Sequence, residues 1–310
     1  MRETNNMQEN ELYFDDEIDL RELFNVIWTA KKLIIQITAI FAIGSVVYSL
    51  SLNNYYKSGS IFLARSASGN QGLSQYSSLA AMAGITLPSS SGEDKAAQMI
   101  ELIKSRKFVK HLMTFENILP SIMAAQTYNK ASKELSFDQK LYDSETKKWK
   151  KGIPSYLQAH EVYISDMLSI SKKTKTGFIS IHIEHISRVF AKDFLELIIQ
   201  ESNELIRKND MEESKQGLGY LTSELSKTPF IEIKESINAL IEAQLETQML
   251  AQINQDYILI EMEPPFIPEK KSKPSRAYIC IFGTMLGGML SVLIVLMRHY
   301  FFAEEEQTVE

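Results

Sequence analysis

The sequence predicts an α+β protein in which two transmembrane helices flank one extracytoplasmic domain. Three observations predict this class. Two charge-free apolar runs lie near the ends of the 310-residue chain. Between them, short segments alternate apolar and polar residues, as half-buried strands do, and longer segments repeat apolar residues at helical spacing. With 23% charged and 45% hydrophobic residues, the chain is neither disordered nor wholly embedded in a bilayer.

The predicted membrane spans are residues 33–52 and 277–297, which contain 20 and 21 residues without a charge. About 20 apolar residues suffice for a helix to cross a bilayer. A signal peptide is not expected at the first run, because 32 residues with more acidic than basic side chains precede it and no small-residue cleavage site follows. The spans divide the rest into an N-terminal cytoplasmic segment 1–32, an extracytoplasmic domain 53–276 and a cytoplasmic tail 298–310.

The flanking charges favour both termini in the cytoplasm. Lys31 and Lys32 precede the first span, although four basic residues before the second span favour the opposite orientation. The net charge of −6 is concentrated in the two acidic tails and argues against a general nucleic-acid binder. A single cysteine leaves no possibility of an internal disulfide.

Alternation of apolar residues predicts strands at Tyr56–Arg65, Gly177–His185 and Tyr257–Glu263. In the second strand His182 and Glu184 share a face, which is the arrangement of a possible metal pair. His185 falls on the opposite face, and the sequence offers no further ligand cluster nearby. We therefore expect no metal site.

Helical spacing begins at Glu93 and is expected to end at Pro120, and residues 130–170 are predicted to be mainly helical. Ser187 is a plausible N-cap for long helices over about 188–255, with pauses at Gly217–Gly219 and Thr228–Pro229. The seam of the second long helix could pack within one subunit or between subunits, and its predicted residues are Ile237, Leu240, Ile241, Leu245, Met249 and Ile253.

Two segments carry weaker signals. Lys147–Lys151 is a basic cluster around Trp149 that could contact an anionic glycan or a lipid headgroup, but a solvated helix face with one packed tryptophan is the favoured interpretation. The serine- and glycine-rich residues 66–92 predict a loop, for which a role in subunit contact is left open.

The residues beside and within the second span form the most distinctive pattern. Several prolines in residues 264–276 exclude a helix or a central strand there and predict a stiff, extended connection at the membrane. Inside the span, the spacing Gly283-x-x-x-Gly287-Gly288 puts small residues on one face, which lets another helix approach closely.

Together with the amphipathic residues 18–24 before the first span, this layout resembles the Wzz family of polysaccharide co-polymerases, the O-antigen chain-length determinants. Ala277 stands where the family motif often has a further proline. The residues that match the family motif are Pro265, Pro268, Ser272, Pro274, Arg276, Gly283, Gly287 and Gly288.

The resemblance implies an inner-membrane protein with a periplasmic α/β base domain and a long helical protrusion. It further implies a ring-like homo-oligomer among membrane lipids that acts with a Wzy-type polymerase on lipid-linked polysaccharide. Such a protein sets the modal length of lipopolysaccharide O-antigen and makes no glycosidic bond itself. The sequence agrees, since it has no P-loop, no G-x-S-x-G and no paired-histidine signature, and we expect no catalytic residue, cofactor or metal.

Three other functions are alternatives to this one. A capsule or exopolysaccharide co-polymerase would work with a separate kinase or export partner, because the 13 residues after the second span are too few for a kinase. A two-span periplasmic sensor would need an output module, for which both tails are too short. A glycan-modifying enzyme would need a catalytic constellation, and none stands out in the sequence.

Overall fold

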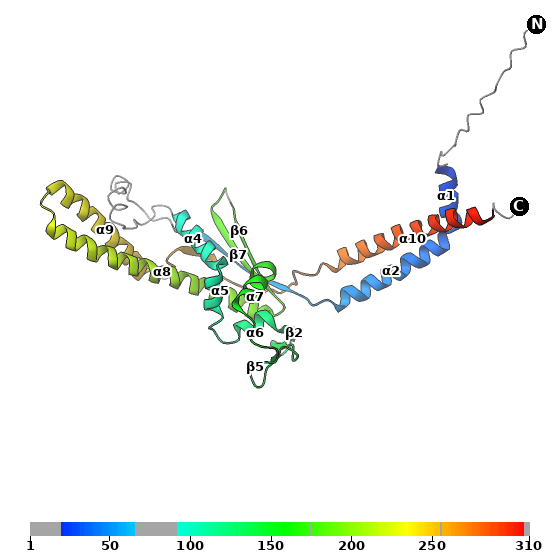
Figure 1. Ribbon diagram of the computed structural model, residues 1–310, viewed down its shortest axis with the longest axis horizontal. Coiled ribbons are helices and arrows are strands. Elements are labelled where there is room, and N and C mark those ends of the chain that lie inside the picture. Colours follow the sequence, from blue (N-terminus) through cyan, green and yellow to red (C-terminus); the bar gives the residue numbers. More distant parts are fainter. Residues whose placement is uncertain (1–19, 66–91, 130, 174, 255, 307–310) are drawn as a thin grey trace, which may run out of the picture. The chain divides into compact units, whose positions relative to one another are not determined.

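The computed structural model describes most of the chain and divides it into two compact units (Figure 1). One unit combines Met1–Leu52 with Pro274–Glu310, and the other is Asn53–Lys273. The start of the predicted amphipathic segment 18–24 and nearly all of the predicted loop 66–92 lie outside the described residues. The described ranges are 20–65, 92–129, 131–173, 175–254 and 256–306.

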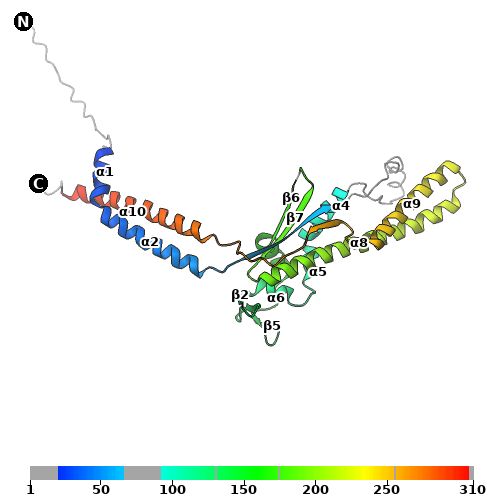
Figure 2. The same ribbon diagram turned by 180° about the vertical axis from the view of Figure 1, so that it is seen from behind.

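The first unit is built from the helices α1 (Leu20–Thr29), α2 (Lys31–Ser51) and α10 (Arg276–Glu306). Both views show α2 and α10 side by side (Figures 1 and 2). Lys31–Ser51 and Arg276–His299 are long and apolar enough to cross a membrane. Most of their large apolar side chains are exposed, as expected of helices whose surroundings are lipid.

The second unit contains a four-stranded antiparallel sheet in the order β6-β7-β1-β8. Its strands are β1 (Tyr56–Ala64), β6 (Leu168–Lys172), β7 (Phe178–His185) and β8 (Leu259–Glu263). The three predicted strands are confirmed as β1, β7 and β8. The predicted α+β class, with two candidate transmembrane helices flanking a sheet-containing domain, is therefore confirmed.

The hydrophobic core lies on one face of this sheet. Because Ser60 pairs with Ile181, the even-numbered residues of β1 share a face with Ile179, Ile181 and Ile183, which are fully buried. The helices α4 (Gly92–Lys104) and α8 (Arg188–Lys227) cover that face. The large buried side chains of the core on β1 and these helices include Phe62, Met99, Ile103, Phe194, Leu195 and Ile198.

The α8 helix pairs with α9 (Ile231–Ile253) to form a long helical hairpin (Figure 2). The Ser187 hydroxyl caps α8 by accepting the N–H of Phe190 at 3.2 Å, as predicted. With 40 residues, α8 is about 60 Å long. The predicted pause at Gly217–Gly219 is wrong, because α8 continues through it. A Cβ on Gly217 would lie 3.5 Å from the Gln244 side chain, so this glycine permits close packing of the two helices.

The predicted seam of α9 is only partly correct. Ile237 and Leu240 are buried, but Leu245, Met249 and Ile253 are 47%, 59% and 73% exposed. Steps of four residues turn about 40° around a helix, so a row of such steps leaves the contact face after one or two turns. The contact continues instead through smaller and polar side chains, namely Ala243, Gln244, Thr247 and Ala251.

The prediction that residues 130–170 are mainly helical is wrong. They contain the strands β3 (Glu134–Phe137), β4 (Tyr142–Asp143), β5 (Lys148–Trp149) and β6, and β2 (Ala125–Asn129) pairs with β3. Lys133 and Lys147 have positive φ angles of 59° and 53°, which a right-handed helix does not allow. Turns at these two residues therefore interrupt the predicted helix. Among the described residues of this region, only α7 (Tyr156–Val162) and the π-helical turn Tyr163–Met167 are helical.

Pro120 does not end a helix, contrary to the prediction. The predicted helix divides into α4 and α5 (Arg106–Leu112), and Ser105 caps α5 by accepting the N–H of Phe108 at 3.1 Å. Pro120 lies in the first turn of α6 (Ile118–Met123), where its missing N–H has no helical partner to lose.

Candidate functional site

The proline-rich segment runs along the edge of β1 beyond β8. The hydroxyl of Ser58 donates to the Phe266 carbonyl at 2.8 Å, and that of Ser60 donates to the Glu263 carbonyl at 2.5 Å. Both serines are almost fully buried. The prolines have no N–H to donate to β1, and these serine hydroxyls of β1 instead donate to carbonyls of the segment and hold it against the strand.

The two ends of the Asn53–Lys273 unit are joined to each other. Tyr55 donates its N–H to the Lys273 carbonyl at 3.0 Å, and Ser272 donates its N–H to the Tyr55 carbonyl at 2.8 Å. Glu184 of β7 fastens this pair, since it accepts from the Ser272 hydroxyl and forms an ion pair with Lys273 at 2.6 Å. The chain therefore enters and leaves this unit at neighbouring positions.

The structure brings together some of the predicted motif residues. Pro265 lines a polar cavity of about 360 Å³ beside α8, Pro268 is buried and Ser272 makes the contacts just described. Pro274 and Arg276 belong to the other unit, where Arg276 begins α10. The hydrogen-bonding partners of this segment were not predicted. The sequence does contain one signal for them, because Ser58 and Ser60 occupy alternate positions of a predicted strand and so lie on one face of it.

The predicted glycine motif packs against α2, the other candidate membrane helix of the same chain. Gly283 faces Ser45, and Gly287 faces Phe41, whose Cβ would lie 2.5 Å from a Cβ added at Gly287. Gly288 has nothing within 4 Å of such an atom. The first two glycines of the motif therefore allow α2 and α10 to approach closely.

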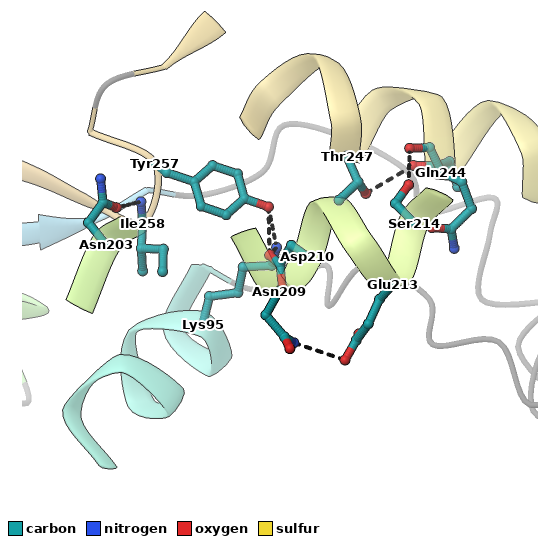
Figure 3. Close-up of polar contacts among 11 residues, drawn as sticks. Lys95, Asn203, Asn209, Asp210, Glu213, Ser214, Gln244, Thr247, Tyr257 and Ile258 are labelled. Carbon is teal, nitrogen blue, oxygen red and sulfur yellow. Dashed lines mark hydrogen bonds and ion pairs between the residues drawn. The ribbon is translucent and has the colours of Figure 1, made fainter. Parts of the chain in front are cut away.

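A polar cluster fixes the helical hairpin to the sheet (Figure 3). Lys95 of α4 lies 2.5 Å from the Asp210 carboxylate of α8, and the Tyr257 hydroxyl donates to the same carboxylate at 2.6 Å. The Lys95 ammonium also donates to the Tyr257 oxygen at 2.9 Å. Burial, and then Asp210, raise the pKa of Tyr257, so the phenol remains a donor. This cluster was not predicted, because its members are far apart in the sequence.

Two further contacts extend this attachment. Asn203 of α8 accepts the N–H of Ile258 at 3.3 Å, just before β8. Farther along the hairpin, the Ser214 hydroxyl donates to the Gln244 carbonyl at 2.6 Å (Figure 3). The chain after α9 is thus held by α8 at several places, which makes the hairpin and the sheet one packed body.

The histidines of β7 have different environments. His185 is buried, with Nε2 3.0 Å from the Ser121 carbonyl and Nδ1 accepting the N–H of Ser187 at 3.1 Å. Burial lowers the pKa of His185 to about 4. Burial and the nearby Lys57 also lower the pKa of His182. Among the described residues, no three histidine, cysteine or acidic side chains are grouped to hold a metal ion.

The environment of His185 predicts acid destabilisation. The neutral form is favoured in the fold, whereas the unfolded chain binds a proton below pH 6.5, so stability is lost as the pH falls from 6.5 to about 4. The expected loss is about 3 kcal/mol. Unfolding of the full-length protein in detergent across this pH range should show it. His185→Gln should make the unfolding free energy depend less on pH over this range. A pH dependence as steep as that of the wild type would show that His185 is not its cause. His160→Gln, at a half-buried histidine on α7, is the control.

The basic cluster Lys147–Lys151 lies on the β4–β5 hairpin, so the predicted helix face is wrong. Trp149 does pack, with its ring centroid 5.0 Å from that of Tyr142. Lys147 forms an ion pair with Glu116 at 2.5 Å. The lysines at 148, 150 and 151 are exposed.

Part of the chain is similar to a known protein family. No curated protein matches the chain. A full-length bacterial polysaccharide co-polymerase of known structure is similar, with 13% sequence identity, a TM-score of 0.45, and coverage of 92% of this chain and 99% of that one. Residues 16–115 match the family model of the chain length determinant protein Wzz, the family that the sequence resembles.

Proposed function

We propose that this protein is an inner-membrane scaffold that regulates the chain length of lipopolysaccharide O-antigen together with a Wzy-type polymerase. The family match over residues 16–115 is the observation that carries the proposal. It covers the first membrane span, β1 and the helices up to α5. Both termini are proposed to be cytoplasmic, and the domain 53–276 periplasmic.

The geometry suits a scaffold. Two paired membrane helices lead into a domain whose ends are joined through Tyr55 and Lys273, and a hairpin with a helix of about 60 Å is packed onto that domain. The proposed ring-like homo-oligomer would array these hairpins beside growing lipid-linked polysaccharide. The scaffold would then limit extension by its geometry or by contact with the polymerase, without forming glycosidic bonds itself.

The lipopolysaccharide ladder on a gel tests this proposal. A deletion strain should replace a modal cluster with a graded ladder, and expression of the chain should restore the cluster. An unchanged ladder with altered capsule or exopolysaccharide size would favour co-polymerisation of that polymer, with a separate kinase or export partner. If neither polymer changes, the proposal fails and a two-span sensor becomes the better interpretation.

The proline-rich segment gives a prediction about length control. Pro268→Ala and Pro274→Ala free a fixed φ and add an N–H in the segment that leads to α10. Each should broaden the modal cluster on the ladder while the protein level, measured by immunoblot, stays near wild type. Pro229→Ala, the same exchange in the exposed turn between α8 and α9, is the matched control. An unchanged modal cluster in both variants would contradict a role for the proline-rich segment in length control.

A further inference from the structure

Residues 147–157 place lysines next to strongly exposed apolar side chains. Lys148, Lys150 and Lys151 are exposed. Two residues after Lys151, Ile153 is 76% exposed, and Leu157 on α7 is 48% exposed. We call Lys148, Lys150, Lys151, Ile153 and Leu157 the basic hairpin surface. Exposed lysines combined with exposed aliphatic side chains are the composition of surfaces that bind the membrane interface.

The basic hairpin surface is held in place by the structure beneath it. Trp149 packs on the buried ring of Tyr142, which in turn lies 5.5 Å from the ring of Phe137. Lys150 donates its N–H to the Leu141 carbonyl at 2.9 Å. Ser155 and Gln158 form a capping box that fixes the start of α7. Docking of this surface therefore requires little further ordering.

Hydrogen bonds connect this region to the residues that directly follow α2 in the chain. The Asn53 amide donates to the Gln126 carbonyl of β2 at 3.0 Å, and Asp138 donates its N–H to the Ala124 carbonyl at 2.8 Å. Asn53 follows the last residue of α2, Ser51, by two positions. At about 3.5 Å per residue, that connection spans about 7 Å. The β2–β3 hairpin is thus bound to Asn53, which follows α2 closely in the chain.

We propose that the basic hairpin surface docks onto anionic phospholipid beside the protein's own membrane helices. The lysine ammonium groups would meet lipid phosphates, and Ile153 and Leu157 would enter the apolar side of the interface. An anionic glycan could satisfy the lysines but offers no apolar environment to these two side chains. This proposal depends on α2 and α10 spanning a membrane and not on the regulation of chain length.

Docking would fix the orientation of the domain on the bilayer. Since Tyr55 and Lys273 pair, both connections to the spans start from one place on the domain, and a single point of attachment permits tilting. The basic hairpin surface supplies a second point. Together, the two would hold the sheet and its helical hairpin at one angle to the membrane.

A fluorescent probe at position 153 tests the docking in the full-length protein. The only cysteine, Cys280, is replaced by alanine, and Ile153→Cys is labelled with the polarity-sensitive dye NBD. Nanodiscs of phosphatidylcholine alone are compared with discs that also contain phosphatidylglycerol. We expect brighter, blue-shifted emission with the anionic lipid, weakening as salt is added. Exchanging Lys148, Lys150 and Lys151 for glutamine should lower the docked-to-undocked ratio about a hundredfold, or about fivefold per lysine.

Matched controls make the test specific. The exchange of Lys208, Lys215 and Lys234 for glutamine removes the same charge from the helical hairpin and should leave the signal unchanged. NBD at Phe230→Cys, an exposed apolar site on that hairpin, should not respond to phosphatidylglycerol. Equal emission in both lipids, or retention of the response without the three lysines, would overturn the proposal. A response to dextran sulfate in phosphatidylcholine discs that matches the lipid response would overturn it in favour of an anionic glycan.

Discussion

Gly287→Leu is expected to separate α2 from α10. Even a Cβ at this position would lie 2.5 Å from the Cβ of Phe41 and 2.9 Å from its Cγ, atoms too close to the backbone to move aside. Helices in lipid gain little from apolar burial against each other, so close packing of small residues is what holds such a pair together. Overpacking of this kind costs about 2–3 kcal/mol. The variant should therefore lose the helix pair and, with it, length control.

An engineered disulfide tests directly whether α2 and α10 are packed against each other. The Thr38 and Ser291 hydroxyl oxygens lie 3.5 Å apart, so cysteines at these two positions, in a Cys280→Ala background, should cross-link α2 to α10. Gly287→Leu should lower the cross-linked fraction strongly. Gly288→Leu adds the same side chain one position along, where an added Cβ meets nothing within 4 Å, and should cross-link like the parent. Full cross-linking in the Gly287 variant would show that the glycine is not needed for packing.

Asp210→Ala is expected to destabilise the helical hairpin by about 3 kcal/mol. The change leaves the Lys95 ammonium and the Tyr257 hydroxyl without their shared acceptor. The side chains of Lys95 and Asp210 are only 21% and 11% exposed, so water replaces the lost contacts poorly. Unfolding of the full-length protein by urea, followed by circular dichroism, measures the loss.

Two comparisons separate this pair from an ordinary surface ion pair. Glu196→Ala breaks the exposed pair with Lys192 on the same helix and should change the unfolding free energy by about 0.5 kcal/mol or less. Replacing Lys95 with methionine together with Asp210→Leu removes both charges and should recover most of the loss. If Asp210→Ala costs no more than Glu196→Ala, the cluster does not fasten the hairpin.

The elements with strong local patterns could be predicted from the sequence. Charge-free runs indicated α2 and α10, alternation indicated β1, β7 and β8, and Ser187 marked the start of α8. The hairpins at β2–β5 could not be predicted in this way. Their strands are short, and their turns place lysine, a residue without turn preference, at positive φ.

Partners were harder to predict than elements. The glycine motif indicated close helix packing but not that Ser45 and Phe41 of the same chain lie opposite. The seam of α9 was misplaced because its apolar residues follow one stripe while its contact with α8 follows another. Lys95, Asp210 and Tyr257 meet only after the chain has folded, and no local pattern marks a pair that is 115 residues apart. The roles of the eight motif residues in length control stay predictions.

The edge formed by β8 and the proline-rich segment limits how copies of this protein can associate. An exposed strand edge is a template on which a second sheet can extend. Here β8 has only five residues, includes Glu261 and Glu263, and is followed by Pro264, Pro265 and Pro268, which have no N–H to offer a neighbouring strand. Sheet-to-sheet polymerisation is therefore blocked on this side. Subunits that meet there must recognise each other by their side chains, and such an assembly can close at a defined number of copies instead of growing into a fibre.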